Sequence, residues 1–317
     1  MRVTAGSRLL AIGVLAAALT ACGGISHSSS ASTAPASEPA SAPTSAPAVT
    51  AATTSRATTP AVSKVIVFMV ENHSLSEMRS GMPKTYAFAR QHSYATDYSA
   101  IRHPSLPNYI AIAAGSTLGI ADDANPSAHR LKGTNVFRQA RQHHKSAKVY
   151  ADAMPHNCAL TNHGEYAVRH NPWAYFVKDR AACRNHDVPA KRLKRDAAAG
   201  NLPDVGFVIP DVMHDAHDGT LAQADRWISR RIRTLTAGPD WTSGRLAIVV
   251  TADEDDKHHD NKVLTVVATH GQQPEVVGRP LDHYSLSGFL SDVIGAHHLR
   301  KARTAPSLAK AFDIKVG

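Results

Sequence analysis

Short runs of apolar, mostly β-branched residues alternate along the chain with longer segments whose apolar residues recur at helical spacing. Such runs are typical of strands that are buried on both faces of a sheet. They predict five strands, at Lys64–Val70, Ala147–Tyr150, Val205–Ile209, Leu246–Thr251 and Val263–Ala268. Two helices are predicted by apolar residues on one helical face, first Leu221, Ala224, Ile228, Ile232 and Leu235, and then Leu286, Phe289, Leu290, Val293 and Ile294. The alternation predicts an α/β fold with a mostly parallel central sheet sandwiched by helices.

The beginning of the chain has the layout of an export signal instead. Arg2 and Arg8 precede an apolar stretch from Leu9 to Ala18, which is shorter than the roughly 20 apolar residues of a membrane-spanning helix. The stretch ends in Leu19-Thr20-Ala21-Cys22, which resembles a bacterial lipobox. We therefore predict a lipoprotein-type signal peptide over residues 1–22, with lipid on Cys22 anchoring an exported protein to the outer face of the cell membrane. The alternative is a simple cleaved signal peptide and a secreted protein.

Composition separates the following segment from the rest of the chain. Residues 23–60 are nearly all Ser, Ala, Thr and Pro, so they lack the large apolar side chains that offset ordering entropy and are predicted to form a disordered tether. Residues 61–317 are long enough to bury the core of one large domain. The chain carries a formal charge of +9 with 43% hydrophobic residues, which excludes a wholly disordered, collagenous or multi-span membrane protein. The domain has no basic stripe with interleaved aromatic residues, so no nucleic-acid partner is predicted.

Cys158 and Cys183 are the two cysteines that remain if Cys22 carries lipid. In an oxidising compartment an even pair is more often a disulfide than a metal or redox site. We therefore predict a disulfide between Cys158 and Cys183. Two buried free thiols are the alternative.

Oxygen-bearing side chains follow several of the predicted strands. In a mostly parallel sheet, ligands bind beyond the carboxyl ends of the strands. Taken singly, Asn72 and Asp218 could cap helices, and an acidic run could be a solvated turn. Taken together, an oxygen-rich set predicts a divalent cation, with Mg²⁺, Ca²⁺ or Mn²⁺ favoured over zinc. The residues concerned are Glu71, Asn72, Asp211, Asp215, Asp218 and the run Asp253–Asp256.

The segment His103–Tyr109 precedes a run of small residues. Its simplest explanation is a proline-fixed turn that leads into a helix. The functional alternative is that Ser105 is a hydroxyl nucleophile held at the start of this helix, with Asn108 one turn along and able to donate to the same anionic oxygen. A serine hydroxyl is a poor nucleophile at its free pKa, and coordination to a nearby metal would activate it.

Six segments resemble motifs of the bacterial phosphoesterase family, and they follow the family's order from about Lys64 to Phe312. This family contains secreted acid phosphatases and phospholipase C enzymes and has the alkaline-phosphatase-like fold. The chain is most similar to the branch of secreted acid phosphatases that includes phosphatidylinositol 3-phosphatase. The segments are Val70–Ser74, His103–Tyr109, Tyr166–Trp173, Asp215–Gly219, Thr251–Asp256 and His283–Leu286.

The resemblance implies a role for each matched polar position. It implies that Ser105 is the nucleophile, and it supports Asn108 as a donor to the oxyanion. The metal ligands it implies are Glu71, Asn72, Asp253 and Glu254, and the further polar positions around the phosphate are His217, Asp218 and His283. The expected reaction is attack by the metal-activated hydroxyl on phosphorus, hydrolysis of a phosphoseryl intermediate by water, and protonation of the leaving alkoxide by His217 or His283.

Several alternatives stay open at this point. The aromatic, basic segment from Tyr166 to Phe176 is either a disulfide-closed packing unit or a substrate-facing one in which Arg169 and His170 contact the phosphate. Residues 61–317 are predicted to be a phosphomonoesterase domain that acts on small phosphates or phosphoinositide-like headgroups. The competing functions are a phospholipase C that cleaves diesters and a surface-tethered binding protein without catalysis.

Overall fold

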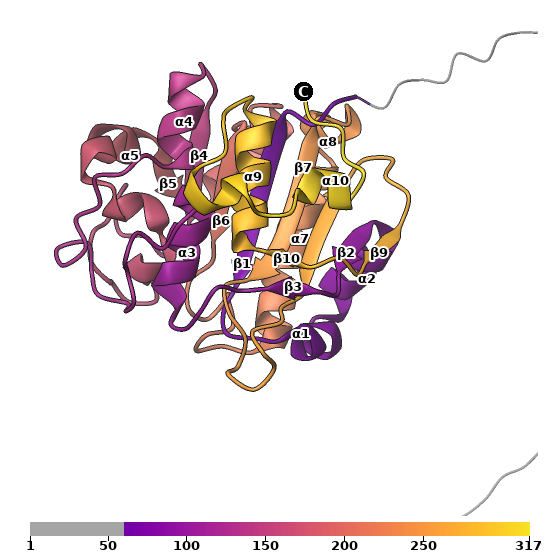
Figure 1. Cartoon of the computed structure of the whole chain (residues 1–317), viewed down its shortest axis with the longest axis horizontal. Coiled ribbons are helices and arrows are strands. Elements are labelled where there is room, and N and C mark those ends of the chain that lie inside the picture. The colour runs from indigo at the N-terminus through magenta and orange to yellow at the C-terminus, as the bar shows by residue number, and fades with distance from the viewer. Residues whose placement is uncertain (1–59) are drawn as a thin grey trace, which may run out of the picture. The chain divides into compact units, whose positions relative to one another are not determined.

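Most strands of the domain lie in one large sheet, shown in Figure 1 for the computed structural model, which describes residues 60–317. The strands are β1 (Lys64–Val70), β2 (Ser93–Ala95), β3 (Tyr98–Ser99), β4 (Ala147–Ala151), β5 (Asp187–Pro189), β6 (Val205–Ile209), β7 (Leu246–Ala252), β8 (Thr265–Thr269), β9 (Glu275–Val277) and β10 (Leu281–Asp282). Eight of them form the sheet in the order β5-β4-β6-β1-β7-β8-β2-β9, and β10 pairs with β3. The predicted signal peptide, its Cys22 and all but the last residue of the predicted tether lie outside the described residues.

The centre of the sheet is parallel, as predicted. Strands β4, β6, β1 and β7 pair in parallel, and nearly every side chain along them is buried. Burial on both faces explains why these strands are continuous apolar runs without polar alternation. The predicted bounds of β1 and β6 are confirmed, and β4 and β7 each extend one residue further.

The last predicted strand differs from the expectation in its bounds and direction. It begins at Thr265 rather than Val263, and it runs antiparallel to β7. A parallel connection needs a crossover, usually a helix, whereas residues 253–264 between the two strands form no helix. The chain therefore turns back beside β7, and an apolar run alone carries no information about that direction.

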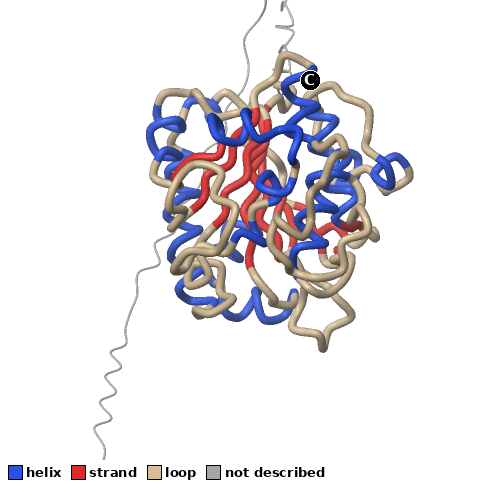
Figure 2. Tube along the Cα trace, turned by 90° about the vertical axis from the view of Figure 1, so that its left-hand side faces the viewer, coloured by secondary structure: helices blue, strands red, loops and turns tan. Residues whose placement is uncertain are grey.

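Helices cover both faces of the sheet, as Figure 2 shows. The first group, α3, α4, α9 and α10, packs together on one side, and α1, α2, α6, α7 and α8 form a second group. The helices are α1 (Leu75–Gly81), α2 (Pro83–Gln91), α3 (Ser105–Ala114), α4 (Val136–Gln142), α5 (Arg180–His186), α6 (Arg192–Ala198), α7 (Leu221–Thr236), α8 (Pro239–Thr242), α9 (His283–Val293) and α10 (Leu308–Ala311). Four 3₁₀ helices complete the list: η1 (Val168–His170), η2 (Pro172–Tyr175), η3 (Val177–Asp179) and η4 (Arg300–Arg303).

Both helices predicted from their apolar faces are present as α7 and α9. Capping boxes fix their starts, with Thr220 as the N-cap of α7 and Asp282 as the N-cap of α9. The N-cap of α1 is Ser74, so the alternative in which Asn72 and Asp218 cap helices is wrong. Among residues 60–317, no helix combines the length and the apolar character that crossing a membrane requires.

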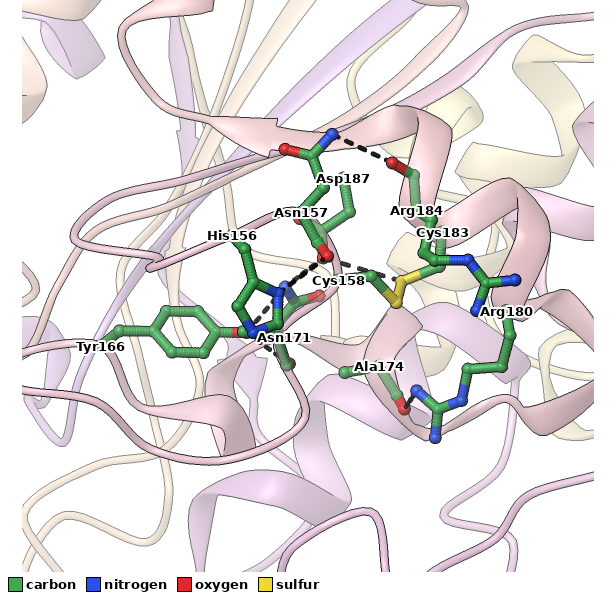
Figure 3. The surroundings of a disulfide bond; sticks show 11 residues. His156, Asn157, Cys158, Tyr166, Asn171, Ala174, Arg180, Cys183, Arg184 and Asp187 are labelled. Atoms are coloured by element: carbon green, nitrogen blue, oxygen red, sulfur yellow. Dashed lines mark hydrogen bonds between the residues drawn. A yellow bond between two sulfur atoms is a disulfide. The ribbon is translucent and has the colours of Figure 1, made fainter.

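The predicted disulfide between Cys158 and Cys183 is confirmed (Figure 3), with 5.4 Å between the two Cα atoms. It joins the loop after β4 to α5. Beside it, the Asn171 side chain donates from Nδ2 to Asp187 Oδ2 at 2.8 Å and to the Tyr166 hydroxyl at 3.1 Å. The disulfide and this buried network therefore hold the segment that contains η1.

Asp187 is a source of pH-dependent stability. Its carboxyl group is fully buried, and Oδ1 has no hydrogen-bond partner. Burial raises the pKa of Asp187 to about 7, whereas an aspartate in an unfolded chain has a pKa of about 3.9. Between these values the unfolded state releases a proton that the folded state keeps, so this group's contribution to stability falls as pH rises from about 4 to 7.

We predict that Asp187→Asn raises the melting temperature at pH 8 and that the gain shrinks toward pH 5. Asparagine cannot ionise, and its side-chain oxygen, placed where Asp187 Oδ2 lies, still accepts the hydrogen bond from Asn171. The measurement is the difference in melting temperature between variant and wild type across this pH range, with Asp260→Asn, an exposed aspartate, as the control. A difference that stays constant with pH, or that grows toward low pH, would contradict the prediction.

Candidate active site

The parallel register of β1 and β7 brings the two predicted halves of the metal site together. Val70 pairs with Ala252 at the carboxyl ends of these strands, so Glu71 and Asp253 are the next residues on neighbouring strands. The Asp253 amide donates to Val70 O at 3.1 Å. In return, the Asn72 amide donates to Asp253 Oδ1 at 3.3 Å. Asn72 adopts a left-handed backbone conformation with φ 57°, which asparagine tolerates better than most residues.

Ser105 is the first residue of α3 and faces this pair of strand ends. Its hydroxyl donates to Glu71 Oε2 at 3.0 Å, and the side chain is buried. The helix is buried along its whole length and ends at Gly115, which has φ 64° and lies so close to Leu299 O that a Cβ atom would stand 2.1 Å from it. The N-cap residue, Pro104, makes no side-chain hydrogen bond to the helix. Asp123 supplies the cap instead, because its Oδ1 accepts from the Leu106 amide at 2.8 Å.

Asn108 lies one turn along α3, as predicted, and ties the helix to its surroundings. Its Oδ1 accepts from the amides of Ile101 and Arg102 at 3.0 and 3.2 Å. Its Nδ2 donates to Arg102 O at 2.6 Å and to Glu254 Oε2 at 3.2 Å. The amide therefore positions the loop before Ser105 and the Glu254 carboxylate. Donation to a phosphate oxygen, which would require Nδ2 to exchange one of these partners, stays a prediction.

A buried histidine that the sequence left undecided bridges two carboxylates. His170 Nε2 lies 3.2 Å from Glu71 Oε2, and its Nδ1 lies 3.1 Å from Asp215 Oδ2. Its ring stacks on Tyr109, whose hydroxyl donates to Glu71 Oε1. Burial opposes the charge on His170, but the attraction of Glu71 and Asp215 prevails and raises its pKa to about 9. His170 is therefore an imidazolium that neutralises buried carboxylates, and it does not contact solvent.

The two histidines predicted to act on the leaving group have different environments. His217 is partly exposed, and its Nδ1 lies 2.7 Å from Oδ1 of Asp218, whose own side chain is 57% exposed. His283 is fully buried, with Nε2 2.6 Å from Asp253 O and Nδ1 3.0 Å from the Tyr98 hydroxyl. Burial lowers the pKa of His283 to about 4, so it is neutral. The geometry makes His283 a positioning residue for Asp253 and leaves His217 as the imidazole at the open edge, held by Asp218.

The loops that carry these groups are closely packed. The Glu71 amide donates to Asp215 O at 2.8 Å, which joins the loop after β6 to the end of β1. Gly219 closes that loop where a Cβ atom would stand 2.0 Å from Met213 O. On the opposite side, His103 Nδ1 lies 3.2 Å from Glu254 Oε1 and its Nε2 lies 3.1 Å from Asp255 Oδ1. His103 thus orients Glu254 from the loop that leads to the nucleophile.

The chemistry of the buried donor set fits a divalent cation. Three buried carboxylates, those of Glu71, Asp253 and Glu254, follow the ends of β1 and β7, and Asn72 is the residue after Glu71, so every side-chain donor of the set is an oxygen atom. Asn72 Oδ1 and Asp253 Oδ2 are buried without a hydrogen-bond partner. Burial, Glu71 and Glu254 together raise the pKa of Asp253 well above its usual range. Uncompensated buried carboxylates are costly, and a cation would pair with them.

A second group, Glu71, His170 and Asp215, also brings three possible ligand atoms close together. Here each nitrogen of His170 faces a different carboxylate. A metal ion would bind one of the two nitrogens of His170 and displace its proton. The carboxylate at the other nitrogen would then lose its cationic partner. The arrangement is therefore an ion bridge, whereas the predicted set contains two buried oxygens without partners, Asn72 Oδ1 and Asp253 Oδ2.

The matched motifs predicted roles for Ser105, the expected metal ligands and His217, whereas Tyr109 and His103 had no predicted role and Asp215 was only one of the oxygen-bearing residues after the strands. All three lie inside the same motifs. Their position in these motifs was the only sequence signal that they belong to the site. Their contacts depend on three separate loops that meet in the fold.

Known proteins with similar sequences support the same chemistry. The sequence model of the Phosphoesterase family matches residues 78–291. A phosphatidylinositol-3-phosphatase of Mycobacterium tuberculosis is 27% identical over 256 residues, which cover 78% of this chain and 82% of that protein. A phosphate-repressible acid phosphatase of Penicillium chrysogenum is 28% identical over 72% of this chain, and the match spans 58% of the fungal protein.

Solved structures with a similar fold have much lower sequence identity. A phosphonate monoester hydrolase of Silicibacter pomeroyi superposes with a TM-score of 0.55 at 12% identity, covering 79% of this chain and 76% of that one. An alkaline phosphatase superfamily protein of Vibrio parahaemolyticus gives a TM-score of 0.54 at 9% identity, covering 80% and 72% of the two chains. These likenesses confirm the predicted alkaline-phosphatase-like fold.

This chain belongs to the Phosphoesterase family and is a hydrolase that acts on phosphoric ester bonds.

We predict that a divalent cation stabilises the wild-type protein and that Asp253→Asn removes most of this effect. Saturation at about 100 times the dissociation constant contributes about 2.7 kcal/mol, which corresponds to a rise of roughly 5–10 °C in a domain of this size. Without added cation, the variant should melt at or above the wild-type temperature, because it removes one of three carboxylates that repel each other. Melting curves with chelator, Mg²⁺, Ca²⁺ or Mn²⁺ provide the measurement.

The control for this experiment is Asp313→Asn, which changes an exposed aspartate and should keep the wild-type response. An equal rise in Asp253→Asn and wild type would rule out Asp253 as a ligand.

Proposed function

We propose that this chain is an exported phosphomonoesterase that transfers the phosphoryl group to Ser105 before water releases it. The observation that carries this proposal is the hydrogen bond from Ser105 Oγ to Glu71 Oε2 at the start of α3. The hydroxyl thus stands at the positive end of a helix, beside the set of oxygen ligands that fits a divalent cation. Such a cation would act as a Lewis acid that lowers the pKa of the hydroxyl and offsets charge on the phosphoryl oxygens.

The first half of the proposed reaction forms a phosphoseryl group. Ser105 Oγ attacks phosphorus in line, and the bond from phosphorus to the leaving oxygen breaks. Ser105 gives its proton to Glu71 Oε2, the oxygen to which its hydroxyl already donates, and a protonated His217 gives one to the leaving alkoxide. Asp218 accepts from His217 Nδ1 and keeps this imidazole in a fixed orientation at the open edge.

The second half restores the enzyme. A water molecule attacks the phosphoseryl group and gives one proton back to His217. The bond between phosphorus and Ser105 Oγ breaks, Ser105 Oγ takes back the proton held by Glu71, and orthophosphate leaves. His170 maintains its contacts with Glu71 and Asp215 throughout, so the charge beside Ser105 stays partly neutralised. Asn108 keeps Glu254 and the loop before Ser105 in place.

The proposed substrates are small phosphate monoesters and phosphoinositide-like headgroups. The mycobacterial relative is named a phosphatidylinositol-3-phosphatase and the fungal relatives are named acid phosphatases, which favours monoesters over diesters. The proposed location is the outer face of the cell membrane, because Leu19-Thr20-Ala21-Cys22 follows a signal-like stretch. A lipid on Cys22 and the polar segment behind it would hold the domain near membrane headgroups.

We predict that Ser105→Ala lowers turnover of p-nitrophenyl phosphate by about 10³-fold or more, because the nucleophile is lost. Metal binding and the melting temperature should change little. Phosphate release by purified protein with added Mg²⁺, Ca²⁺ or Mn²⁺ is the measurement. Ser287→Ala is the matched control, since Ser287 is also buried on a helix of the same group but belongs to α9.

The same assay separates the competing functions when the choline diester of p-nitrophenyl phosphate is included. Wild-type turnover of the diester alone would favour a phospholipase C activity. No turnover of either ester with any of the three cations would favour a binding protein. Wild-type rates in Ser105→Ala would remove Ser105 as the nucleophile.

The lipid anchor gives a separate prediction. Wild-type protein should partition into detergent with the membrane fraction, whereas Cys22→Ser should be unprocessed or appear in the soluble fraction, because it lacks the sulfur that carries lipid. Lipoprotein modification attaches more than one acyl chain, as stable anchoring requires. The measurement is phase partitioning of the expressed full chain, with Ser26→Ala as the control. Equal partitioning of wild type and Cys22→Ser would exclude the anchor.

A further inference from the structure

One cation at the edge of the site has no acidic partner. Arg169 is partly exposed, and its Nη2 lies 3.2 Å from His217 Nε2. Since His217 Nδ1 faces Asp218 Oδ1, the proton of a neutral His217 lies on Nδ1, and Nε2 accepts from the guanidinium. Within residues 60–317, no carboxylate lies within ion-pair distance of Arg169. Arg169 is therefore a free guanidinium whose hydrogen bond to this imidazole can be exchanged.

A series of contacts connects this guanidinium to the reacting groups. Ser105 Oγ and His170 Nε2 both lie within 3.2 Å of the same oxygen, Glu71 Oε2. The His170 ring in turn faces the His217 ring, with 6.0 Å between their centroids. His217 Nε2 then meets Arg169. A continuous series of contacts thus leads from the hydroxyl to Arg169 at the open edge.

The backbone of Arg169 is held by the two residues that follow it. His170, the next residue, is held between two buried carboxylates. Asn171 follows and is anchored to Asp187 and Tyr166 in the disulfide-closed network (Figure 3). Within residues 60–317 its side chain makes one hydrogen bond, to His217, so the side chain can meet a ligand at low cost in backbone ordering.

The net negative charge of the site would favour an additional cationic group near the phosphate. Four buried carboxylates, Glu71, Asp215, Asp253 and Glu254, face one imidazolium and, when bound, one divalent cation. The set then still carries net negative charge, which would repel a phosphate dianion. A guanidinium at the edge offsets this repulsion, and its planar donors match two phosphate oxygens at once.

We propose that Arg169 leaves His217 to bind the non-bridging oxygens of the phosphoryl group and that this contact makes the site selective for monoester dianions over diesters. The inference rests on the proposed phosphomonoesterase function and names the residue that sets its selectivity. A monoester offers three terminal oxygens and up to two negative charges. A diester offers two terminal oxygens and one charge, so it gains less from a second cation.

The test compares Arg169→Gln with wild type and with Arg169→Lys. A hydrogen bond between charged groups contributes about 1.5–3 kcal/mol, so Arg169→Gln should lower kcat/KM for p-nitrophenyl phosphate by about 10- to 100-fold. The inhibition constant of inorganic phosphate should rise by a similar factor, while that of dimethyl phosphate should change less than about threefold. Arg169→Lys should recover part of the loss, because it keeps the charge without the planar pair of donors.

Arg184→Gln is the matched control. Arg184 follows Cys183 in α5, is exposed, and offers only its backbone carbonyl to Asn157. It should keep wild-type constants for every ligand.

The outcomes separate this inference from the proposed function. If wild type turns over no ester, the proposed function fails, and calorimetry of inorganic phosphate binding to wild type and Arg169→Gln still decides the role of Arg169. Unchanged phosphate affinity in Arg169→Gln would overturn the inference. An equal loss of kcat for both esters with unchanged phosphate affinity would also overturn it, because it would show that Arg169 only orients His217.

Discussion

The parallel pairing of β1 and β7 is the constraint on which the whole site depends. The pairing ends at Val70 and Ala252. Glu71 and Asp253 are the next residues on these neighbouring strands and therefore lie side by side. Both carboxylates are fully buried, and neither can be solvated by water at its own position. Every neighbouring polar group can be understood as a response to this concentration of negative charge.

The responses come from different loops and differ in chemistry. His170 supplies a fixed positive charge between Glu71 and Asp215. Ser105 and Tyr109 supply hydroxyl donors to the two oxygens of Glu71. Asn72 Oδ1 and Asp253 Oδ2 remain without partners. His170 offsets part of the negative charge of the buried carboxylates, and a divalent cation at the site would offset more of it.

The sequence predicts the parts of this arrangement that depend on local pattern. The central strands are apolar because both faces are buried, and Ser105 begins a helix because Pro104 ends the preceding loop. The His170 bridge has no local pattern, since a histidine followed by Asn171 and a proline is compatible with a surface turn or with a buried ion pair. The same holds for the direction of β8, which depends on how the chain returns after Asp253–Asp256. Tertiary contacts decide both cases.

The disulfide connects the stability of the fold to the edge of the site. Asp187 lies four residues after Cys183, at the end of α5. Its carboxylate accepts a hydrogen bond from Asn171, the residue after His170. Opening of this segment would release the imidazolium from Glu71 and expose an unpaired carboxylate beside Ser105. Because a loop closed by a disulfide has fewer unfolded conformations, the covalent link favours the arrangement in which the site's own positive charge is in place. The crosslink outside the sheet is therefore connected, through Asp187 and Asn171, to the segment that carries His170.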